Sequence, residues 1–546
     1  MRILLFLLLF SLPAAFPAGA APIAGADEHA VFLSENTTDL PFNQLTANDT
    51  HAGGSLSIVR DPLYGDLQPD GFGGFTYEPY DDFWSLEIDS FVYLLSDAAG
   101  DAEALVTLYA GRPEITAVHM DEDFEDGTFL TNTDYTITLD GNSDLVQSPN
   151  AQLEGFFGAE FYSDGDNALL SAGVGSGSHG TGGQGSGGAT GTVGCLVPPP
   201  SQGGLSADTM LLAVAGVPSD IEGTSQLQVV TTANNKVRLL AHTAQGGVFR
   251  SAELLLPGDR VFFELEWTPS TGSSSNAHNL LLRIDGRAVR LRDVPGLSLG
   301  SPAFHFGLAP TAAQTSFDPV HLAFDNIKLY STEGTGVQPS MLRSVEDFEG
   351  SSSQFGGAIQ TVGQGLQVVH TAASSGEMGL EASASSPGYQ VRSGAALTPS
   401  LTTSLRVDFS EYLTTWGDLA TFYAFGHAPA ATNTDTVMRL RIYGGQGNEP
   451  RLIATFANAT TAGSTWSTSK ALPPGPTTIQ VQFRAATSAQ HANGYLRIWK
   501  DAEVFFELDD LDAIGSEADW NHIGLYAADP GTSGYLSMDE LIIAGR

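Results

Sequence analysis

The sequence predicts an all-β protein, and three observations support this fold class. Apolar and polar residues alternate over many short stretches, of which Lys236–Ala241, Val261–Trp267, Asn279–Ile284 and Thr477–Arg484 are examples. Clusters of Gly, Asn, Asp, Ser and Pro separate these stretches, as they do where turns join strands. Helical periodicity is almost absent after the first residues. Many short strands with turn signals between them are typical of sandwiches or barrels.

Composition limits the possible partners. The chain has 546 residues, of which 62 are acidic and 23 basic, so the net charge is −39. This excess excludes a nucleic-acid binder that works through a basic footprint, and it argues against docking on an anionic membrane surface. A hydrophobic content of 42% allows folded cores. The one cysteine, Cys195, permits neither an intramolecular disulfide nor a Cys/His zinc site.

The first residues have the pattern of a secretory signal. A basic start at Arg2 is followed by the apolar run Ile3–Phe10, and Ala18–Ala20 provides small residues for cleavage, with Ala24–Ala26 as a second option. The sequence therefore predicts a signal peptide over residues 1–20, or as far as residue 26. The run is shorter than the roughly 20 apolar residues of a membrane-spanning helix. We expect a secreted or cell-surface protein with no membrane insertion after signal cleavage.

The rest of the chain divides into three blocks. We expect a first module at 27–111, a second at 120–331 and a third at 344–546, with a linker at 332–343. The stretch 173–191 is rich in Gly and Ser and is predicted to form a flexible loop inside the second block.

The second and third blocks form an internal repeat. Four landmarks occur in both and in the same order: an acidic opening phrase, a strand with a central arginine, a His-x-Gly-Leu phrase and an acidic residue in a closing apolar strand. The two sets are Asp123–Gly127, Arg283, His305–Leu308 and Asp325 in one copy, and Asp347–Gly350, Arg497, His522–Leu525 and Asp539 in the other.

The first block resembles a known family of bacterial surface repeats. Five short phrases, at 47–50, 62–65, 74–79, 89–93 and 96–100, follow the pattern a-N-D-t, p-x-x-G, G-x-f-x-Y-x-P, D-x-F-x-Y and D-x-x-G. This order is similar to that of the cadherin-like or Ig-like repeats, which usually occur in tandem arrays. The resemblance implies a single Ig-like β-sandwich at the start of the mature chain.

The two repeated blocks resemble concanavalin A-like or laminin-G-like domains. The resemblance rests on the F-E-[DG]-G opening and on the D-[NE]-[IL] closing strand. It implies that each block is a two-sheet jelly roll, a fold that many carbohydrate-binding modules share. The predicted fold is therefore an Ig/cadherin-like sandwich followed by two jelly-roll β-sandwiches.

Resemblance to these families also implies a structural calcium in each jelly roll. Similar domains often hold the ion between the opening Glu and the closing Asp, which are Glu125 with Asp325 and Glu349 with Asp539 in this chain. Burying an unpaired carboxylate is costly, and a Ca²⁺ ion with its six to eight oxygen ligands offsets that cost. The alternative is that these acids face water and bind no metal.

The acidic residues are most concentrated in the first block. It carries sixteen acidic residues against one basic residue, Arg60, and divalent cations would relieve that repulsion. By resemblance to the cadherin-like repeats, the candidate calcium ligands are Asn48, Asp49, Asp89 and Asp97. The alternative is an acidic surface suited to saline water.

Signals for catalysis are incomplete. The acidic pairs at 87–89, 264–266 and 503–507 lack the third carboxylate of the E-x-D-x-E strand that jelly-roll glucanases use. No G-x-S-x-G or H-E-x-x-H phrase is present. His305 and His522 recur at equivalent positions and are interpreted as structural, hydrogen-bonding histidines. We therefore expect no catalytic residues.

One aromatic residue is a candidate for ligand binding. Trp466 lies in the polar run Ser464–Thr468 and is expected to be exposed, as a platform that stacks on a sugar ring. The sequence thus favours an exported, non-catalytic binding or adhesion protein for a glycan or another cell-surface ligand, with calcium. Two alternatives stay open: a glycan-active hydrolase on a jelly-roll fold, and a purely structural surface or matrix protein. No oligomeric state is indicated.

Overall fold

The fold was obtained as a computed structural model. It describes residues 21–545 except for 34, 112–113, 123, 125–128, 132–134, 152–156, 174–186, 197–208, 216–225, 233–234, 244–245, 257–259, 270–276, 285–286, 296–302, 311–319, 334–341, 347–358, 370–371, 374–378, 386–387, 394–399, 414–418, 427–435, 446–449, 458–464, 473–474, 485–493, 502, 512–519 and 529–531. The predicted signal peptide at 1–20 therefore lies outside the described residues. Within the described part, the helices are too short to cross a membrane.

The first module is a small sandwich of two sheets with two short helices. A four-stranded sheet has the order β1-β7-β6-β3 and a three-stranded sheet the order β2-β5-β4, with β1 parallel to β7. Alternating apolar residues such as Val31, Tyr77, Phe91 and Val106 fill the space between the sheets. The elements are β1 (Asp27–Phe32), β2 (Thr38–Leu40), α1 (Phe42–Leu45), β3 (Ser55–Arg60), β4 (Gly65–Pro69), β5 (Phe75–Pro79), α2 (Phe83–Leu86), β6 (Ile88–Asp97) and β7 (Gly100–Gly111).

The second block is a jelly roll of two antiparallel sheets around one core. We call the sheet that packs against the Ig-like module the first junction sheet; its order is β10-β11-β23-β13-β19-β20-β21, with β8 added at β23. The other is the first outer sheet, of order β17-β16-β15-β14-β22-β12-β9, with β18 added at β16. The elements are β8 (Glu114–Glu122), η1 (Phe129–Thr131), β9 (Thr136–Leu139), β10 (Asp144–Ser148), β11 (Gly158–Ser163), β12 (Ala168–Gly173), β13 (Gly187–Leu196), β14 (Thr209–Ala215), β15 (Gln226–Thr232), β16 (Lys236–His242), β17 (Val248–Arg250), β18 (Leu254–Leu255), β19 (Arg260–Pro269), β20 (Ala277–Ile284), β21 (Arg287–Pro295), β22 (Ala303–Pro310) and β23 (Val320–Glu333).

The third block repeats the strand order of both sheets, with β30 added and no counterpart of β18. The second junction sheet has the order β26-β27-β39-β29-β35-β36-β37, with β24 and β30 added at β39, and the second outer sheet has the order β25-β28-β38-β31-β32-β33-β34. The elements are β24 (Leu342–Glu346), β25 (Ile359–Gly363), β26 (Leu366–Val369), β27 (Gly379–Ser383), β28 (Gly388–Ser393), β29 (Ser400–Asp408), β30 (Tyr412–Leu413), β31 (Leu419–Gly426), β32 (Thr436–Gly444), β33 (Pro450–Ala457), β34 (Thr465–Ala471), β35 (Pro476–Arg484), β36 (Gly494–Lys500), β37 (Glu503–Leu511), β38 (Trp520–Ala528) and β39 (Ser533–Gly545).

The landmarks of the sequence repeat occupy equivalent positions in the two jelly rolls. Asp325 in β23 and Asp539 in β39 each lie at a register shift against the neighbouring strand, β13 or β29. Gly307 and Gly524 both have a positive φ, of 128° and 113°. A Cβ on Gly307 would lie 2.2 Å from the carbonyl oxygen of Ala168, so the close approach of β12 to β22 requires glycine there.

Some boundaries differ from those expected from the sequence. The prediction of a loop over 173–191 is wrong for its last part, because Gly187–Gly191 belong to β13, a strand inside the first junction sheet. Gly191 packs so closely on the ring of Phe304 that a Cβ would lie 2.7 Å from it, so these glycines serve packing. The expected linker 332–343 is shorter at both ends, since β23 extends to Glu333 and β24 begins at Leu342. The strand β8 already joins the first jelly roll from Glu114.

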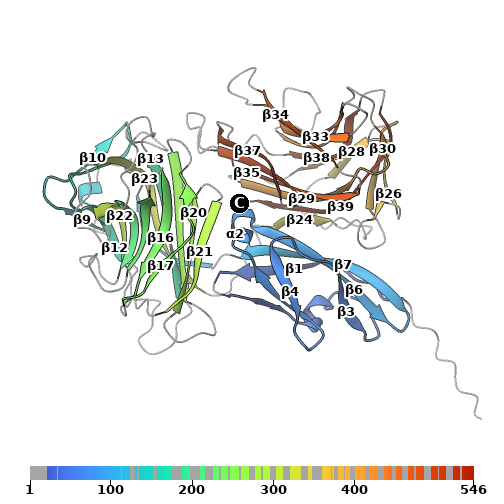
Figure 1. Cartoon of the computed structure of the whole chain (residues 1–546), viewed down its shortest axis with the longest axis horizontal. Coiled ribbons are helices and arrows are strands. Elements are labelled where there is room, and N and C mark those ends of the chain that lie inside the picture. The colour runs from blue at the N-terminus through green and yellow to red at the C-terminus, as the bar shows by residue number, and fades with distance from the viewer. Residues whose placement is uncertain are drawn as a thin grey trace, which may run out of the picture.

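The helix α2 lies where the three modules meet (Figure 1). Phe83 and Trp84 on α2 are fully buried. Leu281 of the first jelly roll and Trp499 of the second join the hydrophobic cluster of the Ig-like module. Because the three modules share one apolar cluster, they pack against one another instead of being joined by linkers alone.

Polar contacts of α2 also reach both jelly rolls. The hydroxyl oxygen of Ser85 accepts a hydrogen bond from the backbone N–H of Ala288, at 2.8 Å. The carbonyl oxygen of Ser85 accepts another from the side-chain amide of Gln482, at 2.7 Å. One residue of the Ig-like module thus bonds to the junction sheets of both jelly rolls.

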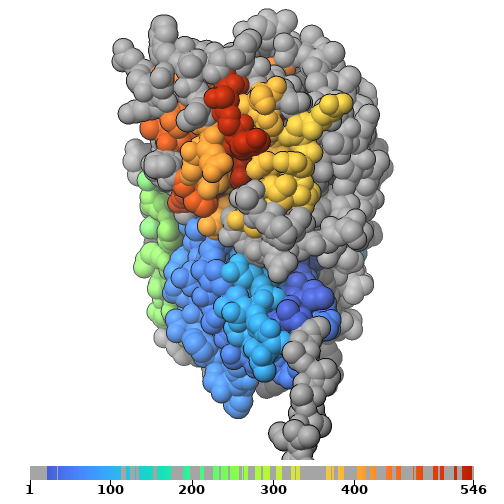
Figure 2. Space-filling model, turned by 90° about the vertical axis from the view of Figure 1, so that its right-hand side faces the viewer, coloured from blue at the N-terminus to red at the C-terminus, as the bar shows by residue number. Residues whose placement is uncertain are grey.

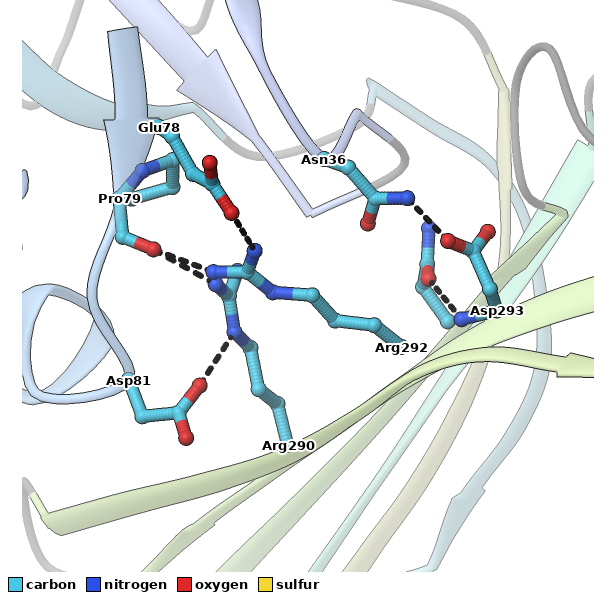
Figure 3. Close-up of polar contacts among 8 residues, drawn as sticks. Asn36, Glu78, Pro79, Asp81, Arg290, Arg292 and Asp293 are labelled. Carbon is cyan, nitrogen blue, oxygen red and sulfur yellow. Dashed lines mark hydrogen bonds and ion pairs between the residues drawn. The ribbon is translucent and has the colours of Figure 1, made fainter. Parts of the chain in front are cut away.

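Arginines of the first junction sheet point into the Ig-like module (Figure 3). Arg290 donates to the Asp81 carboxylate and to the Pro79 carbonyl oxygen, each at 2.8 Å. The guanidinium of Arg290 also lies 5.2 Å from the centre of the Trp84 ring, a cation–π contact. Arg292 donates to the same Pro79 carbonyl.

The third block lies directly against the Ig-like module (Figure 2), and its second junction sheet contacts that module. Arg60 forms an ion pair with Glu540, and the Tyr64 hydroxyl donates to the Gln480 side chain. Ile542 packs with apolar residues of β6 and β7. The printed contacts with the Ig-like module thus come from β20 and β21 of the first junction sheet and from β35, β36 and β39 of the second.

Candidate functional site

Charged residues are divided unevenly between the sheets of each jelly roll. The described strands of the two outer sheets contain no Asp or Glu, although the chain has 62 acidic residues. Their ionised side chains are basic only: Lys236, Arg238 and Arg250 in the first outer sheet, and Arg392, Arg439, Arg441, Arg451 and Lys470 in the second. The described strands of the outer sheets thus carry only basic charges in an acidic protein.

In the second outer sheet, three arginines share one face. On β32, Leu440 and Ile442 are buried in the core, so Arg439, Arg441 and Tyr443 lie on the opposite face, which we call the far face. Successive far-face residues of one strand are roughly 7 Å apart.

The neighbouring strand adds a third arginine to the far face. Arg451 of β33 is paired with Tyr443, and Arg441 with Ile453. The arginine side chains are half-buried and are held by contacts with other parts of the chain. A half-buried guanidinium interacts with an anion more strongly than one in bulk water, and its planar fork matches a carboxylate or a sulfate. This arrangement can bind anions along an extended line.

The first outer sheet has the same layout without the central charge. A row across the strands runs His305, Ala213, Gln228, where the second outer sheet has His522, Ala424, Arg439. Both copies of the repeat therefore have a histidine and an alanine in this row. The third position of the row is the neutral amide of Gln228 in the first copy and the guanidinium of Arg439 in the second.

Two predicted calcium ligands are hydrogen-bond acceptors in the Ig-like module. Asp89 accepts from the backbone N–H groups of Leu63 and Tyr64, both at 2.9 Å, and from the hydroxyl of Tyr77. Burial raises its pKa to about 6 although these bonds oppose the rise. The Asp97 carboxylate accepts hydrogen bonds from three backbone N–H groups, those of Ala52, Ala99 and Gly100. A cation would have to displace these donors, so the two carboxylates do not fit a calcium ligand as they stand.

The other two candidates, Asn48 and Asp49, lie close to the start of the mature chain. The Asn48 amide donates to the carbonyl oxygen of Ala26, and Asp49 accepts from the Gly25 N–H, each at 2.8 Å. The Tyr93 hydroxyl lies 2.9 Å from the Asp49 carboxylate and 3.1 Å from that of Asp27. Calcium at these residues stays a prediction.

This cluster makes the stability of the Ig-like module depend on pH. Burial and then the nearby Asp49 raise the pKa of Asp27 from 3.8 to about 8, against the hydrogen bond from Tyr93. The folded protein therefore holds a proton that the unfolded chain has released, and the stabilisation is lost as the pH rises from about 4 through 8.

We expect Asp27→Asn, which imitates the protonated form, to raise the stability at pH 9 by at least about 1 kcal/mol and to leave it nearly unchanged at pH 4. Thermal unfolding of both proteins at several pH values measures this. An equal pH slope in the two proteins would contradict the proton assignment.

The predicted calcium pairs of the jelly rolls are only partly described. Asp325 and Asp539 are buried in β23 and β39, and both have partners within the chain. Glu125 and Glu349 lie outside the described residues. Among the residues that the structure describes, no group of three His, Cys, Asp or Glu side chains could hold a metal ion.

The landmark arginines form ion pairs with four carboxylates from the acidic pairs considered as catalytic candidates: Glu87, Glu264, Glu266 and Glu507. Arg283 contacts Glu264 at 2.8 Å and Glu266 at 3.3 Å, and it lies 3.8 Å from Glu87. In the second copy Arg497 contacts Glu507 at 2.9 Å. In both copies the central arginine thus forms an ion pair with a carboxylate of a neighbouring strand, which is β19 in the first jelly roll and β37 in the second.

Two further sequence predictions concern His305 and Trp466. His305 is fully buried, and its Nδ1 is 2.8 Å from the Ser171 hydroxyl, in agreement with a structural histidine. Trp466 lies on the edge strand β34, in register with the core residue Phe456. Its side chain lies outside the described residues, so its exposure stays a prediction.

The sequence reading missed the arginines of the second outer sheet. Their signal was present, because Arg439-Leu-Arg441-Ile-Tyr443 alternates with a period of two and so sets the polar residues on one face. The strand β21 also carries three arginines, so the signal that distinguishes β32 and β33 is that these arginines have no Asp or Glu beside them on either strand.

Comparison with known proteins identifies the first module. Residues 20–109 match the family model of the bacterial Ig domain. No curated protein matches the chain in sequence. The chain thus has a region that matches the bacterial Ig domain, followed by two sandwiches that each consist of two antiparallel sheets.

Solved structures with partial similarity cover roughly one domain of the chain. An endo-beta-1,4-glucuronan lyase from the fungus Trichoderma reesei is 12% identical, with 37% of this chain and 94% of that chain covered and a TM-score of 0.28. The carbohydrate recognition domain of Emp47p is 13% identical, with 38% and 99% covered and a TM-score of 0.27. The binding domain of botulinum neurotoxin serotype D is 10% identical, with 38% and 49% covered and a TM-score of 0.27.

Proposed function

We propose that this protein is an exported, non-catalytic binding protein for an acidic glycan, which it holds on the far face of the second outer sheet. The observation that carries the proposal is the set Arg439, Arg441 and Arg451 on two neighbouring strands of a sheet whose described strands contain no carboxylate. Concentrating positive charge on one sheet of a protein of net charge −39 has a use when the ligand is an anion.

A glycan suits this face better than a nucleic acid. The overall negative charge repels a densely charged duplex at long range, whereas a polysaccharide with one carboxylate or sulfate per sugar or two is charged more sparsely. Tyr443 lies among the arginines and offers an aromatic surface for a sugar ring. The bacterial Ig domain at residues 20–109 supports a location outside the cell, at the surface or secreted.

Isothermal titration with polygalacturonate and with the same polymer after reduction of its carboxyl groups tests the proposal. We expect the acidic polymer to bind and the reduced one to bind at least about tenfold more weakly, because charge-assisted hydrogen bonds supply much of the affinity. Equal affinity for both forms, or no binding of the acidic form, would refute the acidic ligand. If incubation with the protein produces new reducing ends or unsaturated ends on the polymer, the protein cleaves the glycan and is an enzyme.

Calcium in the jelly rolls is a separate proposal, supported by buried Asp325 and Asp539 at equivalent register shifts. If the ion binds there, added Ca²⁺ raises the melting temperature and a chelator lowers it. In Asp325→Ala and Asp539→Ala this calcium-dependent rise should be smaller. A melting curve that ignores calcium in all three proteins would exclude the site.

A further inference from the structure

Two neighbouring turns of the first jelly roll bring four carboxylates together. Asp140 follows β9 and Asp144 begins β10, while Asp164 and Asp166 lie between β11 and β12. The backbone N–H of Asp140 donates to the carbonyl oxygen of Asn167 at 2.9 Å, so the two turns lie side by side. Within the described part of the chain, none of the four carboxylates forms an ion pair with a basic side chain. Their charges are therefore not neutralised by the protein there.

Two of these carboxylates approach the same point, beside Gly141. This glycine has a φ of 59° and no side chain, and the position that a Cβ would take is 2.2 Å from Asp166 Oδ2 and 3.3 Å from Asp164 Oδ1. Two carboxylate oxygens thus face one small space between the turns. Like charges at this separation oppose each other's ionisation unless a cation or a proton lies with them.

Unpaired oxygen atoms in the same turns are a second, independent observation. Asp164 Oδ1, which faces the space beside Gly141, is buried and has no hydrogen-bond partner among the described residues. The other oxygen of this carboxylate accepts from the Asn142 amide at 2.7 Å. Ser143 Oγ in the facing turn is also buried and unpaired with any described group. A buried oxygen without a partner costs free energy, which a bound water or ion recovers. A water would leave both negative charges in place, whereas a cation removes both costs.

We propose that these two turns form a calcium site, which uses none of the acidic residues in the opening and closing strands considered above. Ca²⁺ takes oxygen ligands from carboxylates, amides, carbonyl groups and water, in flexible geometry. Asp164 and Asp166 supply the negative charge, and Asn142 and Ser143 offer neutral oxygens beside them. Because neutral oxygens and waters complete the ligand shell, the site does not require three acidic side chains.

Residue spacing in the first of the two turns also suits calcium. Asp140, Asn142 and Asp144 place an oxygen-bearing side chain at every second position. Calcium-binding loops of the D-x-[DN]-x-[DN] type have this spacing, because alternate residues of a tight loop can direct their oxygens to one ion.

The second jelly roll has the same strand order without these acids. Its strands β25 and β26 are equivalent to β9 and β10, and β27 and β28 are equivalent to β11 and β12. The connecting residues are Gln364–Gly365 and Ala384–Pro387, which include no Asp or Glu. The strand order therefore does not depend on the acids, and the second copy serves as an internal reference. Both β9 and β10 lie away from α2 (Figure 1), so changes in these turns leave the junction of the modules intact.

Hydrogen–deuterium exchange read by mass spectrometry tests the site in the whole protein. The probe is Ca²⁺ alone at about 5 mM, because extracellular calcium modules have dissociation constants of roughly 10⁻⁴–10⁻³ M. We expect calcium to slow exchange at least about fivefold at residues 139–145 and 163–168, since the bound ion holds the two turns together. Exchange in the equivalent turn at residues 363–366 should stay unchanged.

Variants with matched charge assign the effect to these residues. Asp164→Asn with Asp166→Asn keeps the size of both side chains and should abolish the slowing by calcium. In chelator its melting temperature should equal or exceed that of the wild type, because the repulsion between the carboxylates is lost. Asp61→Asn with Asp101→Asn removes two exposed acids of the Ig-like module and should keep the slowing.

Three results would overturn the calcium site. The first is equal exchange in both turns of the wild type with and without calcium. The second is the same slowing in Asp164→Asn with Asp166→Asn as in the wild type. The third is equal slowing by Mg²⁺ at the same concentration, which would show a general counter-ion effect. None of these results depends on the binding of polygalacturonate.

Discussion

Replacing Trp84 by alanine is expected to destabilise the junction of the three modules by about 3–5 kcal/mol, the usual cost of removing a fully buried aromatic side chain. Trp84 is fully buried, packs edge-on against Phe83 at 5.2 Å and carries the Arg290 guanidinium over its ring. Losing it leaves a cavity and exposes the Arg290 charge at the centre of the junction. Because α2 contacts both jelly rolls, we expect the modules to separate before they unfold.

Small-angle scattering together with thermal unfolding measures both parts of this expectation. The wild-type protein should give one compact particle, and Trp84→Ala a larger radius of gyration with a first, separate unfolding step. Trp84→Phe is the matched control, because it keeps a ring under Arg290 and removes an indole N–H that has no partner in the described part of the chain. Unchanged scattering and a single transition in Trp84→Ala would contradict the role of this side chain.

The second large effect concerns the arginines of the second outer sheet. We expect Arg439→Gln with Arg441→Gln to weaken the binding of polygalacturonate at least about a hundredfold, since each hydrogen bond to a charged group contributes roughly 1.5–3 kcal/mol. Both residues are half-buried on one face, so their loss changes the floor of the site and leaves the core residues Leu440 and Ile442 in place. Thermal unfolding of the double variant measures separately the stability that is lost with the internal contacts of these two side chains.

A control variant with the same change in net charge shows whether position matters. Arg250→Gln with Lys328→Gln also removes two cations, but from an edge of the first outer sheet and from the first junction sheet. We expect its affinity for polygalacturonate to stay within about twofold of the wild-type value, because surface charges more than a Debye length away are screened. Equal losses in the two double variants would mean that net charge alone drives binding.

Much of the fold could be predicted because strands and turns leave short local patterns in the sequence. The turn and strand phrases at 47–50 and 74–79 led to the Ig-like module, which the family match at 20–109 confirms. The recurrence of Asp325 and Asp539 led to two jelly rolls of equal topology. Alternation and turn signals act within a few residues, so they survive in the sequence as readable periods.

The junction and the division of charge between sheets could not be predicted in this way. The chain crosses between the two sheets at several points, so β28, β38 and β31 are neighbours in the second outer sheet although they are far apart in the sequence. That the acidic residues avoid one sheet therefore appears only after the strands are assigned to sheets. Trp84 reads as a core residue of its own module, and its contact with Arg290 joins positions more than two hundred residues apart. The glycines at 187–191 led to the wrong prediction of a loop, because composition alone does not distinguish a loop from a closely packed strand.

The most direct measurement of the central claim locates the acidic ligand on the protein. Phenylglyoxal labels accessible arginines, and mass spectrometry gives the extent of labelling at each residue with and without polygalacturonate. We predict that the polymer protects Arg439, Arg441 and Arg451 on the second outer sheet, and leaves exposed Arg250 on the first outer sheet unchanged. Bound polymer with unaltered labelling at all three arginines would contradict the claim that this face is the acidic-glycan site.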